Sequence, residues 1–96
     1  METRQAFGQV LKMARKKKSV SQEELSEISS RTYISSLERG LKNPTLDKID
    51  QIGQQLGVHP LTLIAATFAR RDGTSIDDLL KQIRDEYSAL HDKTAT

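Results

Sequence analysis

Residues 30–40 read Ser-Arg-Thr-Tyr-Ile-Ser-Ser-Leu-Glu-Arg-Gly, and this stretch predicts one short helix with a defined beginning and end. Ser30 can cap the helix, because a serine hydroxyl accepts a hydrogen bond from a free backbone amide of the first turn. Gly40 stands where a left-handed residue usually ends a helix. Ile34 and Leu37 fall three residues apart and give this helix one buried face. Its polar side chains should therefore face outward.

Helix signals recur along the rest of the chain, and no sustained alternation of apolar and polar residues indicates a strand. The predicted helices cover residues 3–18, 21–28, 31–39, 45–56, 60–69 and 75–91. Ser21 and Glu24 form a capping box, and Thr45 and His59 are caps. The side chains expected to face inward are Leu46, Ile49, Ile52 and Leu56 in the fourth helix and Leu61, Ile64 and Phe68 in the fifth. The expected fold class is all-α: a five-helix bundle followed by an extra C-terminal amphipathic helix.

The chain has 96 residues, which leaves room for one domain and one added element. We expect a domain at 1–69, a linker centred on Gly73 at 70–74, a helix at 75–92 and a disordered tail at 93–96. Residues 1–71 hold twelve Lys and Arg against seven Asp and Glu, a net charge of +5, whereas residues 72–96 hold three against six, or −3. A basic body favours a polyanionic partner, and the acidic end favours a different role.

Several ordered blocks of the sequence carry a family resemblance. They are Arg15, the Val20-Ser21-Gln22-Glu23-Glu24-Leu25 block, the Arg31–Gly40 block, the Asn43-Pro44-Thr45-Leu46 block and the Leu56-Gly57-Val58 block. Through them, residues 7–64 resemble the phage-repressor and Cro family of helix-turn-helix domains, also called the Xre family. The Arg31–Ser35 stretch followed by Glu38 and Arg39 is especially similar to controller proteins of restriction-modification systems. The resemblance implies a repressor-like fold and a double-stranded DNA partner.

A major groove about 12 Å wide admits one helix, and the helix beginning at Arg31 has small and polar residues where base edges would lie. The resemblance implies base contacts from Arg31, Thr32 and Ser36, and phosphate contacts from Gln22, Tyr33, Lys42 and Asn43. The wider expected DNA-binding set adds Ser30, Ser35 and Arg39. The resemblance also pairs Arg15 with Glu38 as a structural salt bridge that joins the first helix to the recognition helix.

Two positions depart from the family pattern. Ser30 follows Leu25 by five positions, where the family has about seven, so the second helix must end early or the turn must tighten. Ile28 is then expected to take the buried apolar role. Ser19 stands where the family favours glycine. A left-handed serine there would carry about 1 kcal/mol of strain.

The last predicted helix has an apolar stripe formed by Ile76, Leu79, Leu80, Ile83, Tyr87 and Leu90. This stripe can pair with the same helix of a second chain, fold back onto its own domain, or dock another protein. We favour a homodimer, because one recognition helix buries little surface for tight specific binding. A protein partner at this helix is the alternative.

The sequence favours a dimeric transcriptional regulator, a repressor or autoregulator, over other function classes. The alternative is an antitoxin-like or antagonist protein that captures its partner through the C-terminal helix. An enzyme is not expected, since there is no phosphate loop or nucleophile elbow and the two histidines are not placed for catalysis. No cofactor or metal is expected: the chain has no cysteine, which also suits a soluble cytoplasmic protein. Few aromatic residues are available to stack on single-stranded RNA, and no segment is expected to span a membrane.

Overall fold

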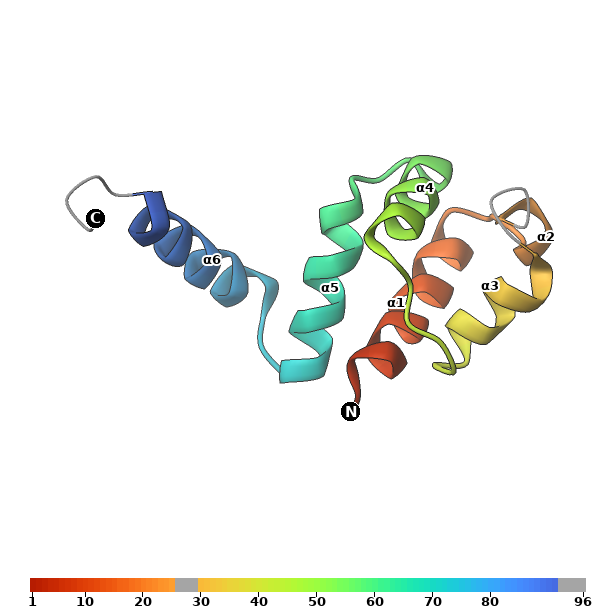
Figure 1. The fold of residues 1–96 in the computed structure, drawn as a ribbon, viewed down its shortest axis with the longest axis horizontal. Coiled ribbons are helices and arrows are strands. Elements are labelled where there is room, and N and C mark those ends of the chain that lie inside the picture. Colours follow the sequence, from red (N-terminus) through yellow and green to blue (C-terminus); the bar gives the residue numbers. More distant parts are fainter. Residues whose placement is uncertain (26–29, 92–96) are drawn as a thin grey trace.

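The structure is a computed structural model that describes residues 1–25 and 30–91. Within these ranges the regular structure is helical throughout, as Figure 1 shows, with α1 at Thr3–Lys17, α2 at Gln22–Leu25, α3 at Arg31–Glu38, α4 at Leu46–Leu56, α5 at Pro60–Asp72 and α6 at Ile76–His91. The all-α prediction is confirmed. The predicted continuation of α2 over 26–28, the expected burial of Ile28, and the expected tail at 93–96 lie outside the described residues.

The first five helices share one hydrophobic core. Helix α1 packs against α5 and α3, α4 packs against α5, and α2 packs against α3 (Figure 1). All five helices contribute to the largest fully buried side chains, which are Val10, Leu11, Leu25, Ile34, Leu37, Ile52 and Leu63. Because α3 buries both Ile34 and Leu37 in this core, its orientation is fixed by packing as well as by its ends.

The predicted helix starts are confirmed by side-chain hydrogen bonds. Ser30 Oγ accepts from the Tyr33 amide at 3.1 Å, and Thr45 Oγ1 accepts from the Lys48 amide at 3.1 Å. The capping box is reciprocal: the Glu24 amide donates to Ser21 Oγ, and the Ser21 amide donates to Glu24 Oε1, each at 3.1 Å. His59 Nδ1 accepts from the Leu61 amide at 3.0 Å. These bonds satisfy amides that have no partner within their own helices.

Two leucines that were expected to face inward do not. Leu46 is 74% exposed and Leu61 is 51% exposed, whereas Leu63 is 2% exposed and belongs to the core. Both exposed leucines lie in the first turn of their helices, at the rim of the bundle. Ile64 packs against the core and is partly buried, as is Phe68.

The connection between α5 and α6 is shorter than expected. Helix α5 continues through Asp72, and Gly73 ends it in the left-handed conformation with φ of 66°. Arg70 and Arg71 lie in the last turn, where basic side chains complement the partial negative charge of a helix C-terminus. The expected linker at 70–74 is therefore wrong in its first three residues, and the connection is the segment 73–75.

Ser19 has the strained backbone that the sequence predicted. Its φ is 56°, and within the described ranges it is the non-glycine residue with a positive φ. Its amide donates to the Lys16 carbonyl at 3.1 Å, while the Val20 amide donates to the Arg15 carbonyl at 2.9 Å. These two bonds form a Schellman motif, which ends α1 and turns the chain toward α2.

Gly8 allows α1 and α3 to approach each other closely. A Cβ at this position would lie 2.5 Å from the Leu37 carbonyl oxygen and 2.6 Å from that of Glu38. Neither neighbour is a side chain that could swing away, since both are backbone atoms of the end of α3. Glycine at position 8 therefore sets the distance between α1 and α3.

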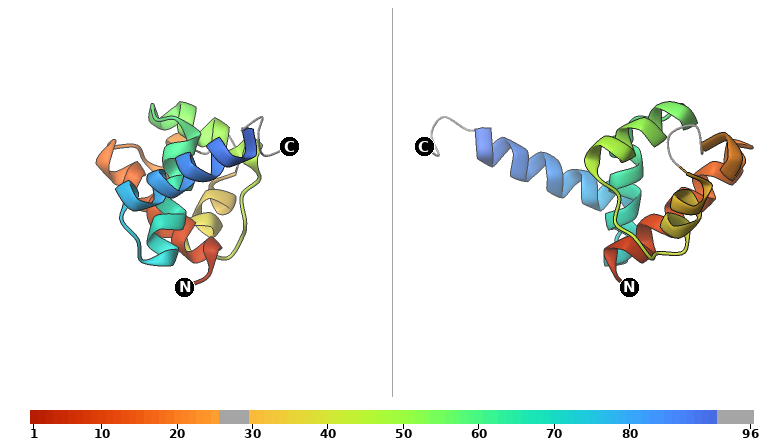
Figure 2. Two further views of the ribbon diagram at one scale, coloured as in Figure 1. Left: turned by 90° about the vertical axis from the view of Figure 1, so that its left-hand side faces the viewer. Right: turned by 45° about the vertical axis from the view of Figure 1, so that its right-hand side comes forward.

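Helix α6 projects away from the bundle, and none of its residues is buried (Figure 2). Ser75 Oγ caps its first turn by accepting from the Asp78 amide at 3.1 Å. The molecule is correspondingly elongated, with principal dimensions of 50 × 24 × 22 Å. The helix packs at its beginning against α5. It does not fold back over the domain that precedes it.

Candidate nucleic-acid interface

A buried ion pair fixes α3 to α1. Arg15 Nε donates to Glu38 Oε2 at 2.6 Å, and Arg15 Nη2 donates to Glu38 Oε1 at 3.0 Å. The Arg15 side chain is 13% exposed and the Glu38 side chain 4%. The hydrogen bond to Glu38, reinforced by the charges of Glu38 and Glu23, raises the pKa of Arg15 although burial opposes this. The salt bridge expected from the resemblance is present, and its two-point geometry restricts rotation between the helices.

Two further hydrogen bonds extend this pair to the segment between α1 and α3. Arg15 Nη1 donates to the Val20 carbonyl at 3.1 Å, and Gln22 Nε2 donates to Glu38 Oε1 at 3.1 Å. Gln22 was expected to contact a phosphate, and here its amide is engaged with a carboxylate. A glutamine amide has two N–H groups, so one donor remains for a phosphate. We name these residues, Arg15, Val20, Gln22 and Glu38, the anchor network.

Arg31 lies at the first residue of α3 and is held by an acidic side chain of α2. Arg31 Nη1 is 3.1 Å from Glu23 Oε1, and both side chains are well exposed, at 65% and 61%. An arginine presents five N–H donors in a planar fork, so one contact leaves others available. The guanidinium is therefore oriented in the structure while it still faces solvent.

Tyr33 and Lys42 lie together, although they are nine positions apart in the sequence. Lys42 Nζ is 5.6 Å from the centre of the Tyr33 ring, a cation–π distance. Tyr33 is partly buried and packs against the core, whereas Lys42 and Asn43 are exposed in the loop after α3. The structure thus brings two of the residues expected at phosphates, Tyr33 and Lys42, into contact beside α3.

The remaining predicted DNA-binding residues differ in exposure. Thr32 and Arg39 are exposed, and Ser35 is partly exposed. Ser36 was expected to face outward, but it is 6% exposed. Ser36 directly precedes the buried Leu37, and its carbonyl accepts a hydrogen bond from the Leu41 amide where the chain reverses after α3. Its side chain therefore faces the bundle. Ser30 is exposed, but its hydroxyl is already used as the cap of α3.

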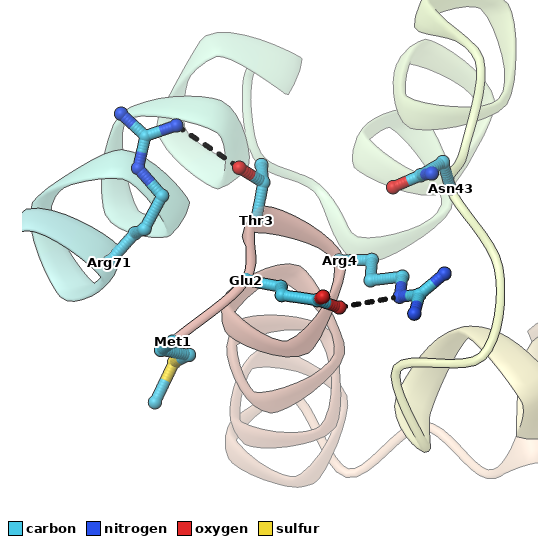
Figure 3. Close-up of a pocket in the computed structure, with 6 residues that line it drawn as sticks. All are labelled: Met1, Glu2, Thr3, Arg4, Asn43 and Arg71. Atoms are coloured by element: carbon cyan, nitrogen blue, oxygen red, sulfur yellow. Dashed lines mark hydrogen bonds and ion pairs between the residues drawn. The ribbon is translucent and has the colours of Figure 1, made fainter.

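A hollow of about 480 Å³ lies beside this surface, where the N-terminus of α1 meets Asn43 and the end of α5 (Figure 3). Arg71 Nη1 donates to Thr3 Oγ1 at 3.0 Å, and Arg4 Nε lies 2.9 Å from Glu2 Oε2. Asp72 accepts two hydrogen bonds from Arg71, which lower the pKa of the Asp72 carboxyl and raise that of Arg71. Both arginines are thus paired with carboxylates, so the hollow does not present a strong uncompensated positive charge.

Within residues 1–25 and 30–91, no group of three or more His, Asp or Glu side chains is placed to hold a metal ion. None of the helices found there combines the length and apolar character needed to cross a membrane. What the surface around α3 offers is hydrogen-bond donors and positive charge on a rigid helix. These are the groups that bind phosphates and base edges.

Comparison with known families identifies the class of protein to which this chain belongs. The helix-turn-helix family model HTH_3 matches residues 11–63. The chain belongs to the helix-turn-helix family. The matched range includes α2, α3 and α4 and all four residues of the anchor network. Membership makes this chain a DNA-binding transcriptional regulator of a family that is not enzymatic.

Curated relatives support the narrower resemblance. Control protein C.BamHI of Bacillus amyloliquefaciens is 45% identical over 64 residues, which are 64% of this chain and 79% of the relative. The uncharacterized HTH-type transcriptional regulator y4dJ of Sinorhizobium fredii (strain NBRC 101917 / NGR234) is 37% identical over 76 residues, or 77% of this chain and 99% of the relative. The predicted similarity to Xre-type regulators and to restriction-modification controllers is confirmed.

Solved structures show the same architecture. The clp gene regulator ClgR from Corynebacterium glutamicum superposes with a TM-score of 0.67 at 29% identity, over 73% of this chain and 94% of that one. A second ClgR structure superposes with a TM-score of 0.70 at 24% identity, over 95% of this chain and 96% of that one. The second match shows the fold alone, and it covers almost the whole of both chains.

Sequence reasoning missed Glu23 and Gly8. Glu23 lies eight residues before Arg31, across the turn between α2 and α3, so no helical spacing connects the two. In the stretch Gln22-Glu23-Glu24, Glu24 was interpreted as part of the capping box and Gln22 as a phosphate contact, while Glu23 received no role, although a carboxylate at the exposed start of α2 is a signal that could have been used. Gly8 carried no sequence signal of its own, because a glycine within an amphipathic helix does not reveal which backbone approaches it.

Proposed function

We propose that this chain is a homodimeric repressor or autoregulator that acts in the cytoplasm on a partly palindromic operator. Helix α3 of each protomer enters the major groove of double-stranded DNA, with half-sites about one helical turn, or 10 base pairs, apart. Arg31 is assigned to guanine O6 and N7, and Thr32 and Ser35 to neighbouring base edges. Lys42, Asn43 and the free N–H of Gln22 are assigned to phosphates.

The observation that carries the proposal is the two-sided character of α3. Ile34 and Leu37 are fully buried, while Arg31 on the same short helix is 65% exposed at its N-terminal end. Recognition helices contact base edges with residues near their N-terminal end. The anchor network supports the same assignment, because it holds α3 in place without using its exposed side chains.

The deciding experiment selects sites from a random pool of duplex DNA with the purified chain, and then measures the mass of the complex on the enriched sequence. An inverted repeat bound by two chains supports the proposal. A single half-site bound by one chain would refute the dimeric operator, and the absence of any enriched sequence at moderate salt would refute specific recognition.

Two variants separate base reading from phosphate contact. Arg31→Ala should relax the preference at one base pair of each half-site, since a bidentate arginine–guanine contact is worth about 1 to 3 kcal/mol. Lys42→Ala should weaken binding by a similar factor on all sequences and reduce its salt dependence. An equal loss on every sequence for Arg31→Ala would remove Arg31 from base reading.

One observation also supports a second candidate function. The apolar stripe of α6 is exposed, as a docking surface for a different protein would also be. Under this alternative the chain is an antitoxin-like or antagonist protein that captures a partner through α6, and its DNA binding is secondary. A partner that copurifies in a one-to-one ratio, together with a monomeric purified chain, would favour the alternative.

A further inference from the structure

Five side chains of α6 form a continuous apolar seam: Ile76, Leu80, Ile83, Tyr87 and Leu90. Their spacings alternate between four and three residues, the period of a two-helix coiled coil rather than of a helix lying on a broad core. All five are exposed, from 39% at Ile83 to 78% at Leu90. An exposed seam of this period fits against a second helix.

The seam continues into a groove on the body of the molecule. Ile76 and Leu80 of α6 line a hollow of about 530 Å³ together with residues of α5 that include Leu61, Ala65 and Ala66. This explains why Leu61 is 51% exposed although it is apolar. One end of α6 therefore borders a groove, while the other end, with Tyr87 and Leu90, projects into solvent (Figure 2).

We propose that α6 pairs antiparallel with α6 of a second copy, and that the projecting end of each helix fills the groove between α5 and α6 of the other. The inference deepens the proposed homodimeric function by specifying the dimer interface. In this arrangement Leu80 faces Ile83 of the second copy, Ile76 faces its Tyr87, and Leu90 reaches its Leu61. The surface is self-complementary, as a two-fold symmetric dimer requires.

The position of the body favours the antiparallel direction. The groove lies at the N-terminal end of α6, beside α5. A parallel partner would bring its own helix start, with its five-helix body attached, into that groove. An antiparallel partner brings the other end of α6, which carries no such body within the described residues. The two bodies then lie at opposite ends of the helix pair.

The charges beside the seam favour the same direction. Asp77 and Arg84 follow seam residues and occupy equivalent flanking positions, seven residues apart. Antiparallel pairing places Asp77 of each copy next to Arg84 of the other, which gives two opposite-charge contacts by symmetry. Parallel pairing instead gathers Asp77 and Asp78 of both copies at one end, where like charges repel.

Cysteine cross-linking tests the direction, because the natural chain has no cysteine. Ile76→Cys and Tyr87→Cys chains, one of them tagged, are oxidised separately and as a mixture, without DNA. We expect a disulfide-linked dimer in the mixture alone, because residues 76 and 87 then face each other. Identical cysteines would lie about 16 Å apart, beyond disulfide reach. Linkage within either single variant, or no linkage in any sample, would overturn the proposal.

Sedimentation equilibrium tests the groove with a residue outside the seam. Leu61→Asp on α5 should weaken dimerisation at least about tenfold, and Leu90→Asp should do the same. Gln82→Asp, on the outer face of α6, is the matched control and should leave the dimer unchanged. All three positions are exposed, so the body stays folded. A dimer unaffected by Leu61→Asp would overturn the groove assignment.

The outcomes separate this inference from the proposed function. Cross-linking and sedimentation use no DNA, so they report pairing alone. A mixed disulfide without any selected operator would keep the interface and refute the DNA-reading dimer. A selected inverted repeat together with linkage within a single variant would keep the regulator and refute the antiparallel pairing.

Discussion

The five-helix body and α6 differ in where their apolar side chains go. The body buries leucines and isoleucines from every one of its helices in a shared core and adds a buried ion pair between α1 and α3. Helix α6 is longer than any of those helices, yet it buries no residue. Helix length and amphipathicity thus do not indicate whether the apolar face of a helix is buried by its own chain. The difference predicts that equivalent substitutions will have unequal effects in the two regions.

The largest difference is expected between two carboxylates. Glu38→Ala should lower the free energy of unfolding by about 3 to 5 kcal/mol, because Arg15 remains poorly exposed without its partner. Asp85→Ala removes the exposed Lys81–Asp85 pair of α6 and should change the free energy of unfolding by less than about 0.5 kcal/mol. Urea unfolding monitored by circular dichroism measures both free energies. Similar losses would show that the anchor network stabilises the body no more than an exposed ion pair stabilises α6.

Gly8 should show the next largest effect. Alanine normally stabilises a helix interior relative to glycine by about 1 kcal/mol. Gly8→Ala should instead destabilise the body by about 1 to 3 kcal/mol, since its Cβ would meet two backbone carbonyls of α3. Gly73→Ala, at a left-handed position with open space around it, is the control, with a loss of about 1 kcal/mol. A Gly8→Ala chain as stable as the natural one would refute the close approach.

Glu23 allows a sharper test of the DNA-facing side of the body. Glu23→Gln should strengthen DNA binding on all sequences by about 2- to 5-fold, because a negative charge leaves the surface and the ion pair with Arg31 is lost. Glu86→Gln on α6 should have little effect on affinity at moderate salt, since α6 projects away from the bundle. Fluorescence anisotropy on labelled duplexes measures both. Weaker binding by Glu23→Gln would instead mean that Glu23 positions Arg31 for its contact.

The smallest effect is expected for serine-to-glycine substitutions, which should be stabilising at Ser19 in the body and destabilising in α6. Ser19→Gly should stabilise the body by roughly 0.5 kcal/mol, because relief of left-handed strain is partly offset by the greater freedom of glycine in the unfolded chain. Ser88→Gly, within α6, should slightly reduce helix content, because glycine is a poorer helix former than serine. Thermal unfolding compares the two, and a destabilised Ser19→Gly chain would contradict the strain.

Features that depend on neighbouring residues in the chain, such as helix caps, could be predicted from the sequence. Features that depend on how separate helices pack against one another could not. Caps at Ser21, Ser30, Thr45 and His59 were predicted because each involves an amide two or three residues away. Burial of Ser36 and exposure of Leu61 depend on how neighbouring helices lie, which periodicity alone does not encode. The residues assigned to DNA contacts remain predictions, and the resemblance rather than the spacing suggested most of them.

The anchor network has a thermodynamic consequence for docking on DNA. A single guanidinium, that of Arg15, holds α3 through Glu38 and the segment before α2 through the Val20 carbonyl, and Gln22 at the start of α2 donates to the same Glu38 carboxylate. The mutual angle of these elements is therefore set while the protein is free. Little backbone entropy is left to be lost on association, so the heat capacity change on binding should reflect the surface buried at the interface rather than any folding of the recognition helix.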